Sequence, residues 1–206
     1  MIAALFLSAS LAIGGSDPID VAVERYQKVE SYEVTLRSSG ADRSDIIRFS
    51  YKRPGFVRMD FVRPHEGAVL IYSPLTMDVR LWPFGEKFFS LTLSPENGLV
   101  QSPTGQRVDQ SDIGALLRHV KTLQRNGETA VVGEERVGGT RALRVLVSGR
   151  GEFVVGNVHR YDLWLDAVTS LPLKVVSRDV KGDIIETVLM DDLRINVRLP
   201  DNLFDP

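Results

Sequence analysis

The sequence predicts a mainly β protein of the α+β type: an unclosed antiparallel barrel of about eleven strands, with two or three helices over a hydrophobic cavity. Short runs that alternate apolar and polar residues follow one another between residues 32 and 93 and again between 129 and 197, with turns between them. Two amphipathic segments interrupt these runs. We find no internal repeat, which argues against a solenoid or a propeller. Because a sheet of this width twists, we expect it to curl toward a barrel.

The clearest strand pair lies within residues 49–63, hinged at Pro54. A proline disfavours the helical conformation in the residue before it, so Arg53 is expected to be extended, at the corner where the chain reverses. Each strand of the pair alternates apolar and polar residues. The apolar side of the pair, which we expect to face the cavity, carries Phe49, Val57, Met59 and Phe61.

Two helices are predicted from apolar residues at helical spacing. The first runs from about Pro18 to Glu30 behind the N-cap Asp17. The second follows Ser111 as N-cap and stops at Asn126. We expect it to lie across the open side of the sheet as part of a lid. Its apolar residues Leu116, Leu117 and Val120 are assigned to the lining of the cavity.

The other strands are also placed by alternation. The polar stretch 94–110 is too long for a hairpin and is expected to be a loop that covers or docks something. Trp82 and Phe89 are assigned to the concave, cavity-lining face. Periodicity alone leaves open whether that face encloses a filled core or a hollow. The remaining strands are expected at residues 32–36, 68–72, 77–82, 87–93, 129–136, 141–147, 158–166, 171–180 and 184–197.

The N-terminal residues are typical of a cleaved signal peptide, assigned to residues 1–14. Their apolar run, 2–13, is shorter than the about 20 residues that span a bilayer, and it ends in small residues. Residues 15–206 are then expected to form a single domain. The chain has a net charge of -2 and no cysteine. We therefore expect no nucleic-acid binding, no disulfide, and no cysteine-based catalysis, metal site or lipid anchor.

Two segments carry a resemblance to a known family. YKRPGFVRMDF resembles a strand pair of the bacterial outer-membrane lipoprotein carriers, the LolA-like lipoprotein localisation factors. The segment beginning YDLWLDAVTSLPLKVV resembles the end of such sequences. The two blocks stand in the family's order, and the similarity extends over nearly all of the mature chain.

The resemblance implies a function as well as a fold. It implies a periplasmic monomer that binds the acyl chains of lipoproteins and ferries them from the inner to the outer membrane. An inner-membrane lipoprotein-releasing transporter would deliver the cargo, and an outer-membrane acceptor would receive it. The Arg of the Lys-Arg-Pro element, here Arg53, would hold the lid of the empty cavity shut. Val57 and Met59 match cavity-lining positions, where carriers often have aromatic residues.

Three alternatives stay open. The same fold could serve a periplasmic sensor of lipids or lipoproteins that signals to a protein partner, or a carrier of another lipid. An enzyme is the third. The three histidines, His65, His119 and His159, lack metal-binding spacing, and no nucleophile-elbow or phosphate-loop motif is present. We therefore expect no catalytic residue, metal or cofactor.

Overall fold

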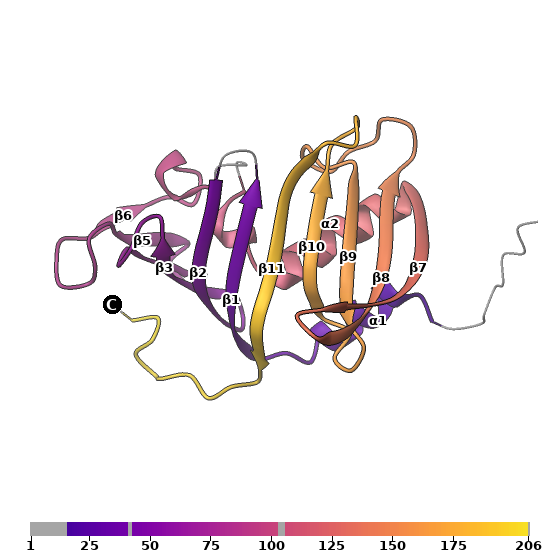
Figure 1. Cartoon of the computed structure of the whole chain (residues 1–206). Helices are drawn as coiled ribbons and strands as arrows, with labels where there is room; N and C mark the ends of the chain where they lie inside the picture. The colour runs from indigo at the N-terminus through magenta and orange to yellow at the C-terminus, as the bar shows by residue number, and fades with distance from the viewer. Residues whose placement is uncertain (1–15, 41–42, 103–105, 206) are drawn as a thin grey trace, which may run out of the picture.

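The computed structural model describes residues 16–40, 43–102 and 106–205. They form one eleven-stranded antiparallel sheet in the order β6-β5-β4-β3-β2-β1-β11-β10-β9-β8-β7, together with two α-helices (Figure 1). The two outer strands, β6 and β7, do not pair with each other, so the barrel is unclosed. The predicted fold class is therefore confirmed. The predicted signal peptide lies outside the described residues.

The sheet consists of two meanders joined by the pairing of β1 with β11. The first meander contains β1 (Ser31–Gly40), β2 (Arg43–Lys52), β3 (Phe56–Arg63), β4 (Val69–Ser73), β5 (Asp78–Trp82) and β6 (Leu91–Leu93). The second contains β7 (Gly127–Val137), β8 (Thr140–Gly149), β9 (Arg160–Asp166), β10 (Pro172–Arg178) and β11 (Ile184–Ile195). Every connection within a meander is a local reversal, which is why neighbours in sequence pair antiparallel.

The helices α1 (Pro18–Tyr26) and α2 (Ile113–Arg125) pack against each other on the concave side. In Figure 1 the strands lie in front of α2, which contacts β7 and β8. The main core lies between this helix pair and the sheet. Its largest fully buried side chains are Ile19, Tyr32, Phe49, Leu117, Leu123, Leu163 and Leu171.

The start of α2 differs by one residue from the prediction. Ser111 is not the N-cap, because its hydroxyl donates a hydrogen bond of 2.6 Å to the carbonyl of Val108 in the preceding 3-10 turn. Instead the Asp112 carboxylate accepts the backbone N–H groups of Gly114 and Ala115 at 2.6 and 3.2 Å. A carboxylate also suits the partial positive charge at a helix N-terminus better than a hydroxyl does.

The segment after β5 also differs from the prediction. A strand was expected over residues 87–93, but only Leu91–Leu93 pair with β5, and residues 83–90 form a loop. Trp82 does not face the cavity. Val79 is in the main core, so Trp82, three residues later in the same strand, points to the convex face. There it packs with Val69, Ile71 and Phe204.

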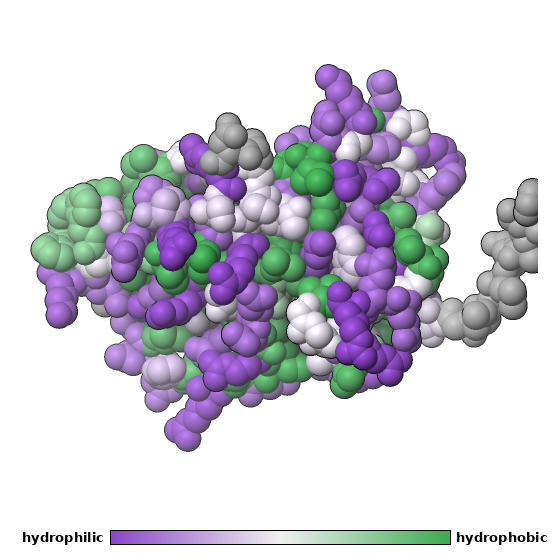
Figure 2. Space-filling view, viewed as in Figure 1, coloured by the Kyte–Doolittle hydropathy of each residue, from purple (hydrophilic) through white to green (hydrophobic). Residues whose placement is uncertain are grey.

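The C-terminal segment covers part of the convex face next to β3. Phe204 packs against Phe56 with ring centroids 5.6 Å apart, and Arg58 donates a hydrogen bond of 3.1 Å to the carbonyl of Leu203. Elsewhere the surface that faces the viewer is mostly hydrophilic (Figure 2). The sheet therefore directs its larger apolar area toward the concave side.

Candidate ligand-binding cavity

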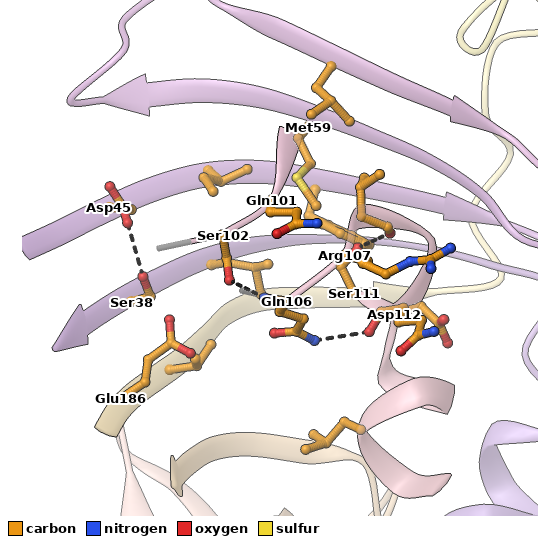
Figure 3. A pocket seen from close by; sticks show the side chains of 18 of the residues that line it. Ser38, Asp45, Met59, Gln101, Ser102, Gln106, Arg107, Ser111, Asp112 and Glu186 are labelled. Atoms are coloured by element: carbon orange, nitrogen blue, oxygen red, sulfur yellow. Dashed lines mark hydrogen bonds between the residues drawn. The ribbon is translucent and has the colours of Figure 1, made fainter. Parts of the chain in front are cut away.

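A cavity of about 1350 Å³ lies between the concave face of the sheet and the lid formed by α2 and the loop before it (Figure 3). The volume exceeds the roughly 300–1,000 Å³ of a pocket for a drug-sized ligand. Exposed residues at the rim, Arg43 and Leu99, also line it, so the space opens to solvent there.

The sheet contributes the apolar wall. Because side chains alternate across each strand, the cavity-lining residues of β1 to β5 lie on one face of the sheet, and β11 adds further residues to the same wall. Phe49 is stacked on Tyr32 with ring centroids 5.8 Å apart, which fixes the floor. The apolar side chains contributed by strands include Val34, Leu36, Ile47, Phe49, Met59, Phe61, Leu70, Leu81, Val188 and Met190.

The lid contributes a mixed surface. From α2, Ile113, Leu116 and His119 line the cavity. Burial, with a smaller contribution from the adjacent Arg118, lowers the pKa of His119. The imidazole is therefore neutral at pH 7, as an apolar cavity requires. The preceding loop adds polar groups, including Gln101, Ser102, Gln106, Arg107 and Ser111 (Figure 3).

A polar group of three side chains lies at one end of the sheet wall. Ser38 comes from β1 and Asp45 from β2, and the Ser38 hydroxyl lies 3.5 Å from a carboxylate oxygen of Asp45. Glu186 comes from β11 (Figure 3). Burial raises the pKa of Glu186, and the charge of Asp45 raises it further, while a hydrogen bond from Ser38 opposes the shift. The sheet wall of the cavity is thus apolar along its length and polar at this end.

Tyrosines connect the lid to the sheet and to α1. The Tyr26 hydroxyl donates a hydrogen bond of 2.8 Å to Asp112, and the Tyr32 hydroxyl accepts one of 3.2 Å from the backbone N–H of Ile113. Burial, above all, raises the pKa of both tyrosines, so both hydroxyls stay protonated. The N-terminus of α2 is therefore held by α1 and β1 together.

Arg53 binds the end of α1. Its guanidinium donates hydrogen bonds to the carbonyls of Val29, Tyr26 and Gln27 at 2.9, 3.2 and 2.8 Å. These carbonyls lie at or just beyond the C-terminus of the helix, where intrahelical partners are missing. The helix was expected to continue to Glu30 but ends at Tyr26. Arg53 satisfies the freed carbonyls as the chain turns into β1.

The residues assigned to the cavity from the sequence fall into three groups: those that line it, those in the core beside it, and two that lie away from it. Phe49, Met59, Phe61 and Leu116 line the cavity. Val57 of β3 and Leu117 and Val120 of α2 are buried in the core beside it.

Trp82 and Phe89 do not line the cavity: Trp82 lies on the convex face, and Phe89 is 59% exposed in the loop after β5. Glu186 and Met190 were not predicted to line it. The alternation in the last strand was the available signal for them.

The described residues contain no cluster of three or more His, Cys, Asp or Glu side chains placed to hold a metal ion. His65 packs edge-on against Phe61 and His119 lies on the lid, both lining the cavity. His159 instead contacts the carbonyl of Phe153 through Nδ1 at 2.9 Å. Within the same residues, no helix has the length and apolarity that crossing a bilayer requires.

We expect Arg53→Leu to loosen α1. Hydrogen bonds from a charged donor contribute about 1.5–3 kcal/mol each, so losing them should speed amide exchange in α1 by roughly tenfold or more. Hydrogen-exchange mass spectrometry measures this. Lys52→Leu, at the exposed neighbouring position, is the matched control. If the amides of α1 exchange at the same rate in both variants, core packing holds α1 without a contribution from Arg53.

We expect Glu186→Gln to stabilise the protein in a pH-dependent manner. A raised carboxyl pKa in the folded state means that ionisation destabilises the fold, so wild-type stability falls as pH rises through that pKa. The melting temperatures of wild type and variant should be similar near about pH 3.5, below the ordinary Glu value, and diverge in favour of the variant at neutral pH. Glu128→Gln, on an exposed side chain, should show no such divergence. Parallel curves for Glu186→Gln would contradict the burial argument.

Solved structures share this fold at low sequence identity. The Pseudomonas aeruginosa MucA/MucB complex matches with a TM-score of 0.56 and 17% identity, over 92% of this chain and 60% of that chain. An uncharacterised conserved protein from Thermus thermophilus matches with a TM-score of 0.55 and 13% identity, over 92% and 91%. The Mycobacterium tuberculosis lipoprotein LppX matches with a TM-score of 0.52 and 10% identity, over 89% and 95%. These similarities establish the fold alone.

Comparison of the sequence with family models identifies the family of this chain. No curated protein matches the chain by sequence. The family model for the MucB/RseB N-terminal domain matches residues 96–206, more than half of the 206 residues, including α2 and the whole second meander. The predicted resemblance to lipoprotein carriers is thus supported at the level of the fold, while the carrier family itself is not the one matched. The chain belongs to the MucB/RseB N-terminal domain family.

Proposed function

We propose that this protein binds acyl chains of lipids or lipoproteins in its cavity and acts in the periplasm as a carrier of acylated lipoproteins between the inner and outer membranes. The observation that carries the proposal is the cavity of about 1350 Å³ with a largely apolar sheet wall. A protein whose concave face served only as a core would fill this space with its own side chains.

The energetics suit this role. Removing one CH₂ group of an acyl chain from water is worth about 0.8 kcal/mol. Binding then needs an apolar hollow and no catalytic centre. The polar residues at one end of the sheet wall, Ser38, Asp45 and Glu186, would contact the head of such a ligand while its chain lies along Met59 and Phe61.

Arg53 has a part in this proposal. It holds α1, and α1 holds α2 through the Tyr26–Asp112 hydrogen bond and an ion pair of 2.6 Å between Asp20 and Lys121. Loosening α1 would therefore loosen the lid. A lid that is stable in the closed, empty state competes with ligand, which keeps affinity moderate and permits release.

We expect Met59→Asp to abolish or weaken acyl binding by at least roughly tenfold, because a carboxylate placed in an apolar cavity loses its hydration without gaining a partner. Titration with a fluorescent fatty acid measures the dissociation constant. Leu75→Asp makes the same kind of change at a side chain that is 76% exposed in the β4–β5 turn, and should bind as wild type does. Circular dichroism establishes that both variants are folded. Unchanged binding by folded Met59→Asp would place the ligand elsewhere.

A second candidate function is favoured by the family match. MucB has been solved in complex with MucA, and this chain spans 60% of that MucB chain. A sensor of this kind would bind a protein partner and change that affinity when a lipid fills the cavity. The chain would then report on acylated molecules rather than deliver them.

The two candidates differ in one measurable coupling. For a sensor, the affinity for a MucA-like segment, followed by fluorescence anisotropy, should change at least about fivefold when fatty acid saturates the cavity, as typical coupling free energies imply. For a carrier, the affinity should be absent or insensitive to fatty acid, and labelled acyl cargo should move to acceptor vesicles. Met59→Asp serves as control, because it should remove any effect of the fatty acid.

A further inference from the structure

The loop between β5 and β6 exposes three aromatic side chains within six residues. Phe84, Phe88 and Phe89 are 66%, 65% and 59% exposed. Phe84 and Phe89 meet edge to face with centroids 5.9 Å apart, so they form one surface. In Figure 2, hydrophobic side chains gather at the end of the molecule where Figure 1 draws this loop. Exposed apolar groups of this kind mark a contact surface.

The aromatic loop, residues 83–90, is continuous with the rim of the cavity. Pro83, its first residue, lines the cavity, as does Leu81 just before it. Gly85 abuts the β3–β4 turn, because a Cβ at Gly85 would lie 3.4 Å from the carbonyl oxygen of Gly67. In that same turn, His65 also lines the cavity. Pro83 thus joins the rim of the cavity to the loop that carries the exposed rings.

The charges of the loop favour a lipid headgroup surface. Its acidic side chain, Glu86, is turned back onto Arg58 with an N–O distance of 2.9 Å. Its basic side chain, Lys87, is exposed beside the phenylalanines. Aromatic rings next to a base are typical of protein segments that settle at the boundary between headgroups and acyl chains.

From this arrangement we propose that the aromatic loop inserts into the surface of a lipid bilayer and brings the cavity rim against it. The inference rests on the proposed function: an acyl chain that passes between cavity and membrane would do so at the rim beside Pro83, where the inserted loop holds the rim against the bilayer. The aromatic rings supply the insertion, and Lys87 supplies attraction to anionic headgroups.

Co-flotation of the full mature chain with phosphatidylethanolamine–phosphatidylglycerol vesicles tests the inference. The double variant Phe84→Ser/Phe88→Ser should lower the bound fraction at least tenfold. The matched control is Leu75→Ser/Met77→Ser, at side chains that are 76% and 69% exposed in the β4–β5 turn, at the opposite end of β5. It should bind vesicles as wild type does. Both variants should bind the fluorescent fatty acid normally.

The outcomes separate this inference from the proposed function. If wild type binds fatty acid but not vesicles, the loop inference is overturned and the function stands. If wild type binds vesicles through the loop but takes up no fatty acid, the loop inference stands and the function fails. Equal loss in both double variants would overturn the role of this loop. Light scattering that shows a dimer of wild type and a monomer of Phe84→Ser/Phe88→Ser, without vesicle binding, would assign the surface to a second copy of the chain.

Discussion

The dominant constraint on this molecule is that its helices are too small to cover its sheet. At about 1.5 Å per residue, the 13 residues of α2 reach roughly 20 Å. Eleven strands spaced about 4.8 Å apart span nearly 50 Å around the curve. Because most of α2 packs on β7 and β8 and only its N-terminus reaches β1, part of the concave face of β1 to β4 is left to a loop. The cavity is the space that this mismatch leaves.

The lid is held by hydrogen bonds at the start of α2, and by buried valines and ion pairs in the loop over the cavity. At the start of α2, Asp112 receives bonds from two backbone N–H groups and from the Tyr26 hydroxyl, and Arg53 secures the end of α1. Over the cavity, the lid consists of short 3-10 turns and polar side chains, with Arg107 paired to Glu96 and Asp109. One valine of each turn, Val100 and Val108, is buried in the main core. Opening this part of the lid would therefore expose both side chains to water.

The sequence predicted what depends on local alternation. The concave faces of β2 and β3 were correctly derived because each residue's side of a strand follows from counting. Two assignments near Pro83 were wrong. Trp82, at the end of β5, lies on the convex face because Val79 and Leu81 of the same strand face inward. After Pro83 a turn resets the pattern, so Phe89 was assigned to a wall that it does not join. Alternation also does not say how far a helix extends over a sheet. Val57 and Met59 lie on the same, concave face of β3, yet Val57 is buried in the packed core and Met59 lines the cavity.

The N-cap of α2 and the hydrogen-bond partners of Arg53 could be identified only from the three-dimensional structure. Ser111 and Asp112 are both good N-caps, and only the 3-10 turn that engages Ser111 decides between them. Arg53 was predicted at the corner of two strands. Its hydrogen bonds to carbonyls at the end of α1 could not be predicted from the sequence, because they join residues 24 to 27 positions apart. The polar end of the cavity depends on β1 pairing with β11, a contact between the two ends of the chain.

We expect the cavity to be hollow in water and to hold an acyl chain in the cell. The most direct measurement is native mass spectrometry of the protein purified from a periplasmic fraction, followed by lipid extraction. The purified protein should show a mass increment that corresponds to an acylated protein or lipid and that is lost on extraction. A protein that is always recovered empty and that also excludes a fluorescent fatty acid would contradict it, and would leave the concave face as a surface for a protein partner.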